Sequence, residues 1–488
     1  MKEEHIRIIF GLKIKQLRKD KHLSLQELSE KSGISISYLN EIEKSKKYPK
    51  ADKIFKLAEA LQVSYDYLVS LQLDDKMKTI SDLLQSDILS ELPLDIFGID
   101  VATFIELLSD APSKLNAFII TLMDISRAYD ISKEEFFLSA LRAYQEMHDN
   151  YFPDLEQAAE KLKKQFGLEK PSVQRLEEIL ETAYQYQIDA YDFDEDPELK
   201  GLRSIVLPGK APRLLFNRNL TENQKLFTLG RELGHCFLSL ENRPLSYSWV
   251  SVHSFEEVLN HFKASYFSCA LLIPEKGFVK DLEHFLYQPT LEASRLLQLI
   301  EKYTVTPETL IYRLTNVLPK HFGLKELFFL RISKNTETKN FSLNKELHLT
   351  GIHHPHASKG QEDYCRRWVS ATIFDDFERS GERVVGKGQF SFYPDGDSYF
   401  VFAIAYRAGM NAKEHVSISF GLKANALFKR KVKFHNDQNI PLRYVGTTCQ
   451  RCPVENCEVR VAAPKFLLEA QRKEAKRQAM ERLKKQML

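Results

Sequence analysis

The spacing of apolar residues along the 488-residue chain changes character several times. Residues 6–70 place apolar side chains three or four positions apart in short runs, which predicts five short helices. Residues 71–166 continue the helical spacing almost throughout. Residues 199–220 change to a period of two around Pro208 and Gly209, which predicts a strand, a turn and a second strand. The same alternation recurs at 325–334, 389–406 and 415–422. We therefore predict a mainly α protein with an α+β C-terminal part built on an antiparallel sheet.

These changes divide the chain into four parts, consistent with its length. We predict a five-helix N-terminal domain (1–72), a helical linker, sensor and dimerisation region (73–170), a third domain (171–320) and the α+β domain (321–488). With 43% hydrophobic and 28% charged residues, the composition is that of a globular protein. No apolar run approaches the roughly 18 residues that span a bilayer. We expect a cytoplasmic protein with no membrane partner.

The N-terminal part contains strong helix-boundary signals. The run SLQELSEKSG begins with Ser24 as an N-cap, has Glu27 three residues later as in a capping box, and ends at Gly33. A second helix, ISISYLNEIEKSKKYP, follows and ends before Pro49. Two short helices joined through a glycine turn predict a helix-turn-helix. The segment resembles the phage-repressor-like (XRE or Cro/CI) helix-turn-helix family.

A helix-turn-helix reads DNA through its second helix, whose first residues meet base edges while neighbouring side chains bind phosphates. The predicted DNA-binding residues are Ser35, Ser37, Tyr38 and Asn40 for the bases, and Gln26, Lys44, Lys46 and Lys47 for phosphates. Repressor-type domains bind paired half-sites, so we expect a homodimer on operator DNA. The alternative is a helical bundle used for protein contacts, with the lysines on a solvated face.

Residues 227–238 read FTLGRELGHCFL, which differs at one position from the zinc motif H-E-x-x-H. With the preceding strands and the run FKASYFSCALLIPE, this segment resembles the ImmA/IrrE metallopeptidase domain. In that family two histidines on one helix face bind zinc and the glutamate is the general base. Here Arg231 replaces the first histidine, Glu232 and His235 remain, and the position of the usual acidic third ligand holds His261. Because arginine cannot lose its proton to bind a metal, we expect a degenerate zincin-like domain and no enzyme activity.

Two interpretations of Arg231 remain open. It forms an ion pair with Glu232 or a neighbour, or it helps the former active-site cleft to hold an anionic small molecule. Arg142 also lies among apolar helical positions, where a buried cation needs an anionic partner. The candidate ligand-binding residues are Arg142, Arg231, His235, Lys263 and Tyr266. His235 on its own is typical of a core histidine.

Three cysteines, Cys449, Cys452 and Cys457, have the spacing C-x2-C-x4-C in the segment GTTCQRCPVENC. Clustered cysteines in a large cytosolic chain are typical of a metal site. The leading fourth ligand is Cys365, with His353, His354 and His356 as substitutes. A single C-x-x-C knuckle favours a 4Fe-4S cluster over zinc, and basic neighbours, chiefly Arg451 and Arg460, are expected to favour thiolates. The alternatives are zinc and free cysteines in a surface loop.

The combination of these segments resembles the short-chain fatty acyl transcriptional regulators, with SRAYDISKEEFFLSALRAYQEMHDNYFP and ETLIYRLTNVLPKHFGLKELFFLRI also matching. The resemblance implies a bacterial regulator of acetate or propionate metabolism that senses an acyl-coenzyme A, and some members resemble iron-sulfur proteins at these cysteines. Two other functions stay open. One is an active zinc metallopeptidase that cleaves a partner repressor, and the other is a phage-type or toxin-antitoxin regulator controlled by protein contacts.

Overall fold

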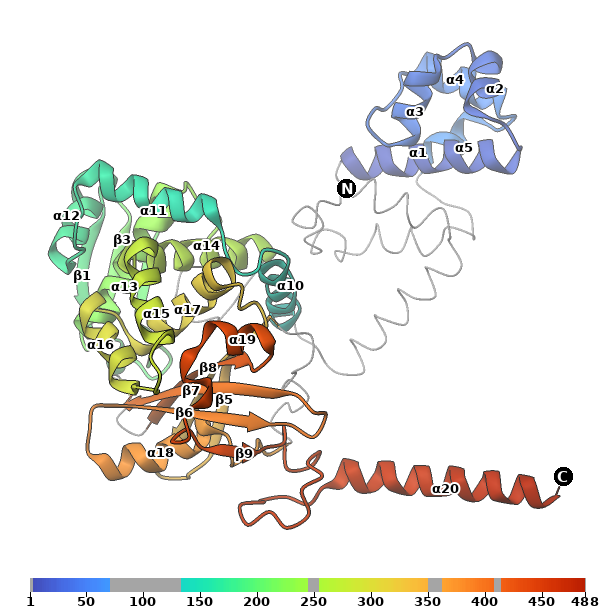
Figure 1. Ribbon diagram of the computed structural model, residues 1–488. Coiled ribbons are helices and arrows are strands. Elements are labelled where there is room, and N and C mark those ends of the chain that lie inside the picture. Colours follow the sequence, from blue (N-terminus) through green and yellow to red (C-terminus); the bar gives the residue numbers. More distant parts are fainter. Residues whose placement is uncertain (1–2, 71–132, 245–253, 350–361, 408–413, 488) are drawn as a thin grey trace. The chain divides into compact units, whose positions relative to one another are not determined.

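The computed structural model describes residues 3–70, 133–244, 254–349, 362–407 and 414–487 (Figure 1). The chain divides into two compact units. The first contains residues 1–140 with 253–256, and the second contains the rest of the chain. Most of the predicted linker and sensor region lies outside the described residues, as do His353, His354 and His356.

The N-terminal unit contains the five helices that the sequence predicts: α1 (Glu3–Asp20), α2 (Leu25–Ser32), α3 (Ile36–Glu43), α4 (Ala51–Ala60) and α5 (Tyr65–Val69). Their apolar faces form one core that includes Phe10, Leu28 and Leu57. The buried Lys13 on α1 donates from Nζ to the carbonyl of Ser70 at 2.6 Å, which ties the first helix to the end of the fifth.

The second unit begins with helices around a small sheet. Its helices in chain order, including the last part of α10, are α10 (Lys133–Met147), α11 (Pro153–Phe166), α12 (Val173–Tyr184), α13 (Glu222–Phe237), α14 (Phe255–Leu272), α15 (Glu275–Leu286), α16 (Ala293–Tyr303) and α17 (Pro307–Val317). The strands are β1 (Gln187–Tyr191), β2 (Ser204–Leu207) and β3 (Arg213–Asn217), in the order β1-β3-β2. The predicted strand, turn and strand are β2 and β3, which pair antiparallel, whereas β1 pairs parallel to β3.

The C-terminal part of this unit is a six-stranded sheet in the order β5-β4-β8-β7-β6-β9. Its strands are β4 (Leu327–Asn335), β5 (Phe341–His348), β6 (Val384–Phe392), β7 (Ser398–Arg407), β8 (Glu414–Lys423) and β9 (Leu442–Tyr444), and its helices are α18 (Val369–Ser380), α19 (Ala426–Lys431) and α20 (Lys465–Met487). Neighbouring strands are antiparallel except β6 and β9. The apolar face of α18, through Phe374 and Phe377, forms a core with Phe328 and Tyr399 of the sheet.

These elements confirm the predicted fold class, with an N-terminal helical domain and a C-terminal sheet domain. Among the described residues, none of the helices is both long enough and apolar enough to cross a membrane. The side chains of α20 are exposed from Leu468 to Lys485. This helix therefore gains little from burial of apolar surface.

Candidate functional site

The helix-turn-helix is built by α2, a glycine turn and α3. Ser24 caps α2 in a full capping box with Glu27, and Gly33 ends the helix at φ +65°, a left-handed conformation that glycine adopts without a Cβ clash. Ser35 then caps α3 by accepting from the amide of Tyr38 at 3.4 Å. The two helices are thus set by their own boundary residues, which fixes where α3 begins.

The start of α3 presents a surface suited to base edges. Ser37 is exposed, Tyr38 and Asn40 are partly exposed, and Ile36 is 47% exposed although it is apolar. An exposed isoleucine beside small polar groups can contact a thymine methyl group in the major groove. Sequence reasoning missed Ile36 because an apolar residue at a helix start is usually assigned to the core. Ser35 is exposed, but the structure gives its hydroxyl a capping role.

The predicted phosphate-binding residues lie on the outside of the same domain. Gln26, Lys44, Lys46 and Lys47 are all exposed. Lys47 forms an exposed ion pair with Glu41 at 3.0 Å, and Gln26 bonds Glu30 at 3.3 Å, which leaves these side chains free to exchange partners at small cost.

The orientation of α3 is held by a partly buried ion pair. Arg18 of α1 donates from Nε and Nη2 to the two carboxylate oxygens of Glu43 at 2.7 and 2.8 Å. Arg18 also donates to the carbonyl of Leu23 at 2.8 Å. A bidentate pair fixes angle as well as distance, so α1 and the end of α3 move together.

The zincin-like helix is α13, and its motif residues are among the most buried in the chain. Gly230 and Gly234 bring α13 close to α14, because a Cβ on Gly230 would lie 2.6 Å from Ser268 Oγ. On the motif face, Arg231 is 3% exposed and Glu232 is 1% exposed. The fold of the peptidase helix is therefore present with a guanidinium where the first zinc ligand is expected.

Glu232 is fully engaged by two arginines. Arg231 Nη2 donates to Glu232 Oε1 at 3.3 Å and to Ser204 Oγ at 3.2 Å, while Arg243 Nη2 donates to Glu232 Oε2 at 2.6 Å. This is the ion-pair arrangement that the sequence left open for Arg231. Each carboxylate oxygen of Glu232 therefore already accepts a hydrogen bond from an arginine side chain, which leaves it poorly placed to accept a proton from a water molecule.

The two histidines of the remnant site are buried next to these cations. Burial, together with Arg243 and Arg231, holds the pKa of His235 well below its ordinary value. Burial, then Arg231 and His235, does the same to the pKa of His261. Both imidazoles are therefore neutral near pH 7. In the part of the chain that the structure describes, no three His, Cys, Asp or Glu side chains are grouped as a metal site requires.

The five predicted ligand-binding residues do not form one site. Arg231 and His235 lie together, whereas Arg142 pairs with Glu346 on β5 at 3.6 Å. Lys263 is partly exposed on α14. The Tyr266 hydroxyl belongs to a separate buried network, described next. The structure thus brings only two of the five together.

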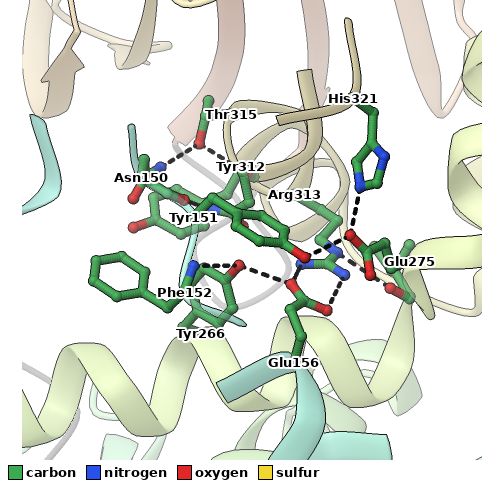
Figure 2. Close-up of polar contacts among 12 residues, drawn as sticks. Asn150, Tyr151, Phe152, Glu156, Tyr266, Glu275, Tyr312, Arg313, Thr315 and His321 are labelled. Atoms are coloured by element: carbon green, nitrogen blue, oxygen red, sulfur yellow. Dashed lines mark hydrogen bonds and ion pairs between the residues drawn. The ribbon is translucent and has the colours of Figure 1, made fainter. Parts of the chain in front are cut away.

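Sequence reasoning missed that network, which joins α11, α14 and α17 (Figure 2). Arg313, fully buried on α17, donates to Glu156 of α11 from Nη1 at 2.5 Å and from Nη2 at 2.8 Å. Tyr266 donates its hydroxyl proton to Glu156 at 2.7 Å, and Arg313 Nε donates to the carbonyl of Ile273 at 3.1 Å. The one signal was an arginine in the apolar run TLIYRLTNV.

A second cluster lies beside this ion pair. Tyr151 donates to Glu275 Oε1 at 2.7 Å, and His321 contacts the same carboxylate (Figure 2). Burial raises the pKa of Glu275, but the hydrogen bonds from Tyr151 and His321 outweigh it, so the net pKa is lowered. Together the two clusters fasten the start of α15 and the end of α17 to the turn before α11.

The cysteine loop folds against the residue predicted as its fourth ligand. The amide of Cys365 donates to the carbonyl of Thr447 at 3.1 Å, and the amide of Gly446 donates to Cys365 Sγ at 3.4 Å. A Cβ on Gly446 would lie 2.8 Å from Cys452 Sγ. Cys365, Cys449 and Cys452 are buried, Cys457 is partly exposed, and all four are free thiols.

The basic neighbours of these cysteines have other partners in the structure. Arg460 donates to the carbonyls of Cys449 at 2.7 Å and Cys452 at 3.1 Å, and Arg451 pairs with Glu362 at 2.8 Å. Burial raises the pKa of the Cys365 thiol. The Arg460 side chain therefore holds the loop by binding its backbone carbonyls. The expectation that arginines favour the thiolates has no support at Cys365.

Two family models match the chain at the two domains described above. Residues 14–68 match the helix-turn-helix family, and residues 183–315 match the IrrE N-terminal-like domain. The chain is therefore a DNA-binding transcriptional regulator of the helix-turn-helix class that carries an IrrE-like, peptidase-related domain.

The similarity extends over whole relatives as well as single domains. The chain is homologous to the HTH-type transcriptional regulator RamB of Mycobacterium tuberculosis (strain ATCC 25618 / H37Rv), with 23% identity over 490 residues, 92% of this chain and 93% of RamB. It is 40% identical over 75 residues to SinR of Bacillus subtilis (strain 168), which covers 15% of this chain and 64% of SinR. A solved structure titled Mycobacterium tuberculosis transcriptional regulator aligns with a TM-score of 0.47 at 20% identity, covering 67% of this chain and 93% of the other.

Proposed function

We propose that the protein binds paired operator half-sites as a homodimer and that its IrrE-like domain is a regulatory module rather than a peptidase. The observation that carries the proposal is the ion pair of Arg231 with Glu232 at the former zinc position. A guanidinium here excludes zinc by charge and occupies the carboxylate that a peptidase needs as a base. The domain keeps the peptidase fold without the residues for zinc-dependent hydrolysis. Such a domain can still bind a ligand and regulate the DNA-binding domain.

The charge balance around the remnant site favours an anionic effector. Arg231 and Arg243 face the single carboxylate of Glu232. A second carboxylate, Glu308, is approached by Lys345 at 2.5 Å and Arg331 at 3.6 Å. Arg231 and Lys345 both lower the pKa of His261 and Glu232 raises it, so one cation from each ion-pair group lies near that histidine. Phosphates are natural ligands of neighbouring arginine and lysine side chains.

The resemblance to short-chain fatty acyl regulators supplies the effector class. We propose an acyl-coenzyme A of the acetyl or propionyl type, whose phosphates bind the cations near His261 and change operator affinity. The regulated genes would then serve short-chain fatty acid metabolism. Among the ligand residues predicted from sequence, Arg231 is the one that the proposal uses directly.

We also propose that the cysteine loop holds a 4Fe-4S cluster through Cys365, Cys449, Cys452 and Cys457. Support comes from the four free thiols and from the contact of Cys365 with Gly446 of the loop, 81 residues along the chain. Among the described residues the four thiols are not grouped as a metal site requires, so a bound cluster would draw them together. When bound, a cluster supplies a redox state and sensitivity to oxygen or nitric oxide. Gly446 leaves room for the Cys452 side chain, and Arg460 holds the loop backbone in place.

The effector proposal is tested by calorimetry and footprinting on the protein's own upstream region. We expect acetyl- or propionyl-coenzyme A to bind the full chain and to shift operator affinity. Arg231→Gln should weaken effector binding about tenfold or more, since it removes a charge-assisted contact. The matched control Arg213→Gln, in an exposed ion pair with Asp189, should bind as the wild type does. The effector proposal is rejected if no acyl-coenzyme A of any chain length gives a binding signal. The non-peptidase assignment is rejected if the protein cleaves a protein substrate in a zinc-dependent reaction that His235→Ala abolishes.

The cluster proposal is tested on protein prepared without oxygen. A brown protein that absorbs near about 400 nm and contains about four iron atoms per chain supports it. A colourless protein with one zinc per chain rejects it. Cys365→Ala should lower the iron content, while Cys269→Ala, which changes a buried cysteine in α14, should leave it unchanged.

A further inference from the structure

The C-terminal sheet domain contains an open cleft that none of the preceding functions uses. Its volume is about 790 Å³, within the range of small-molecule sites. One wall is α18, another is the hairpin formed by β4 and β5, and the remainder comes from β6, β9 and the segment that follows the cysteine loop. Six cationic and three acidic side chains line it.

Half of those cations are already neutralised within the cleft. Lys334 pairs with Glu378 at 2.8 Å and lies 3.7 Å from Asp375. Lys387 and Arg379 both pair with Asp376, at 2.5 and 2.8 Å. The three carboxylates of the cleft are therefore all engaged.

Three of the described cations form no close ion pair within the cleft, although Lys339 lies near enough to Glu378 to help lower the pKa of that carboxyl. Among the described residues, no hydrogen bond or ion pair joins the side chain of Lys339 or Arg443 to a carboxylate. Arg366 stacks on the ring of Phe341 at 4.1 Å, its Nε is buried with no hydrogen-bond partner among the described residues, and its nearest carboxylate, Asp363, is 3.9 Å away. Stacking fixes the guanidinium plane while its donors stay available.

The cleft also has an apolar wall. Val459 and Val461 are 43% and 54% exposed, and both line it. They follow Cys457 by two and four residues, so whatever covers them touches the end of the cysteine loop. Cations without a close carboxylate beside exposed valines suit a ligand that has a phosphate at one end and an apolar part at the other.

We propose that this cleft is a binding site for an organic phosphate, with the phosphate held by Lys339, Arg366 and Arg443 and the organic part against Val459 and Val461. The site is separate from the remnant zincin site and does not depend on the effector proposed there. Its occupant stabilises the segment after Cys457, which links a phosphate ligand to the state of the cysteine loop.

The test is equilibrium binding to the full chain with three probes: inorganic pyrophosphate, ADP and coenzyme A. All three share the phosphate chemistry, and the organic part of ADP or coenzyme A adds contact with the valines. We expect ADP or coenzyme A to bind more tightly than pyrophosphate. The double variant Lys339→Gln/Arg443→Gln should weaken pyrophosphate and ADP at least about tenfold, because it removes two charged phosphate contacts. Coenzyme A, which the remnant zincin site is also proposed to bind, should show the same loss when it is titrated in the Arg231→Gln background.

A matched control removes the same two charges elsewhere. Lys429→Gln/Arg430→Gln changes exposed residues of α19 that do not line the cleft, and its affinities should equal those of the wild type. Val461→Ser should weaken ADP or coenzyme A but leave pyrophosphate unchanged. The proposal is overturned if no probe binds, if both double variants lose affinity equally, or if Arg231→Gln abolishes binding while the cleft variant does not. Thermal unfolding of each variant confirms that the exposed substitutions leave the domain folded.

Discussion

Replacing Glu156 by leucine should cost about 3–5 kcal/mol of stability in the IrrE-like domain. The carboxylate accepts two hydrogen bonds from Arg313 and one from Tyr266. Without it, the fully buried Arg313 keeps one hydrogen-bond acceptor among the described residues, the carbonyl of Ile273 at 3.1 Å. An uncompensated buried charge accounts for most of the cost, since leucine itself fills much of the glutamate volume.

The second step of the same experiment separates charge from packing. The double variant Glu156→Leu/Arg313→Met removes both charges, and such replacements of buried ion pairs are often neutral. We therefore expect the double variant to recover to within about 1–2 kcal/mol of the wild type. A control in the exposed pair of Arg175 and Glu178, Glu178→Leu, should cost under about 1 kcal/mol.

Hydrogen exchange measured on peptides from 153–166 and 307–317 is the suitable assay, because a chain of several domains does not unfold in one step. Operator binding in the same samples reports on the helix-turn-helix, which should be unaffected. The reasoning is refuted if Glu156→Leu costs no more than the exposed control. It is refuted equally if the double variant is as unstable as the sum of the single ones.

Further predictions concern acid stability, the salt dependence of DNA binding and the C-terminal helix. Burial raises the pKa of Glu308, but Lys345, Arg203 and Arg331 lower it to about 2 against an ordinary 4.5. The ionised carboxylate should therefore stabilise the fold by about 3 kcal/mol above pH 4.5, and this contribution should disappear towards pH 2. In an acid titration, Glu308→Gln should lose less stability than the wild type. Lys46→Gln should reduce the slope of log affinity against log salt by about 0.9 if it contacts one phosphate, with sequence preference unchanged in footprints. Truncation after Leu467 should leave the melting temperature of the sheet domain within about 2 °C, because the side chains of residues 468–485 are exposed. A larger fall contradicts this.

The elements were predictable where their signals are local. Ser24, Ser35 and Ser64 cap their helices through their own side chains, and Gly33 ends α2 in the left-handed conformation, so residues within four positions of each boundary carry the information. The alternation of apolar residues with serine or glycine along β8 is similarly local. The parallel pairing of β1 with β3 carries no such signal, because register between strands separated by other elements is set by tertiary packing.

The sites divide in the same way. Arg231 and Glu232 are neighbours in sequence, so their ion pair could be proposed before the fold was known. Glu156 and Arg313 are 157 residues apart, and nothing near either one indicates the other. The cleft beside the cysteine loop was missed for a further reason: whether a lysine or arginine has a carboxylate partner depends on the folded neighbours and cannot be derived from composition.

The arrangement around α13 bears on evolutionary reversibility. Restoring histidine at 231 would recreate the H-E-x-x-H letters, and the close approach of Gly230 and Gly234 to α14 is still in place to support them. Arg243, however, would continue to hold Glu232 Oε2 at 2.6 Å. A lineage returning to proteolysis would thus have to change residue 243 as well as residue 231 before Glu232 could act as a base.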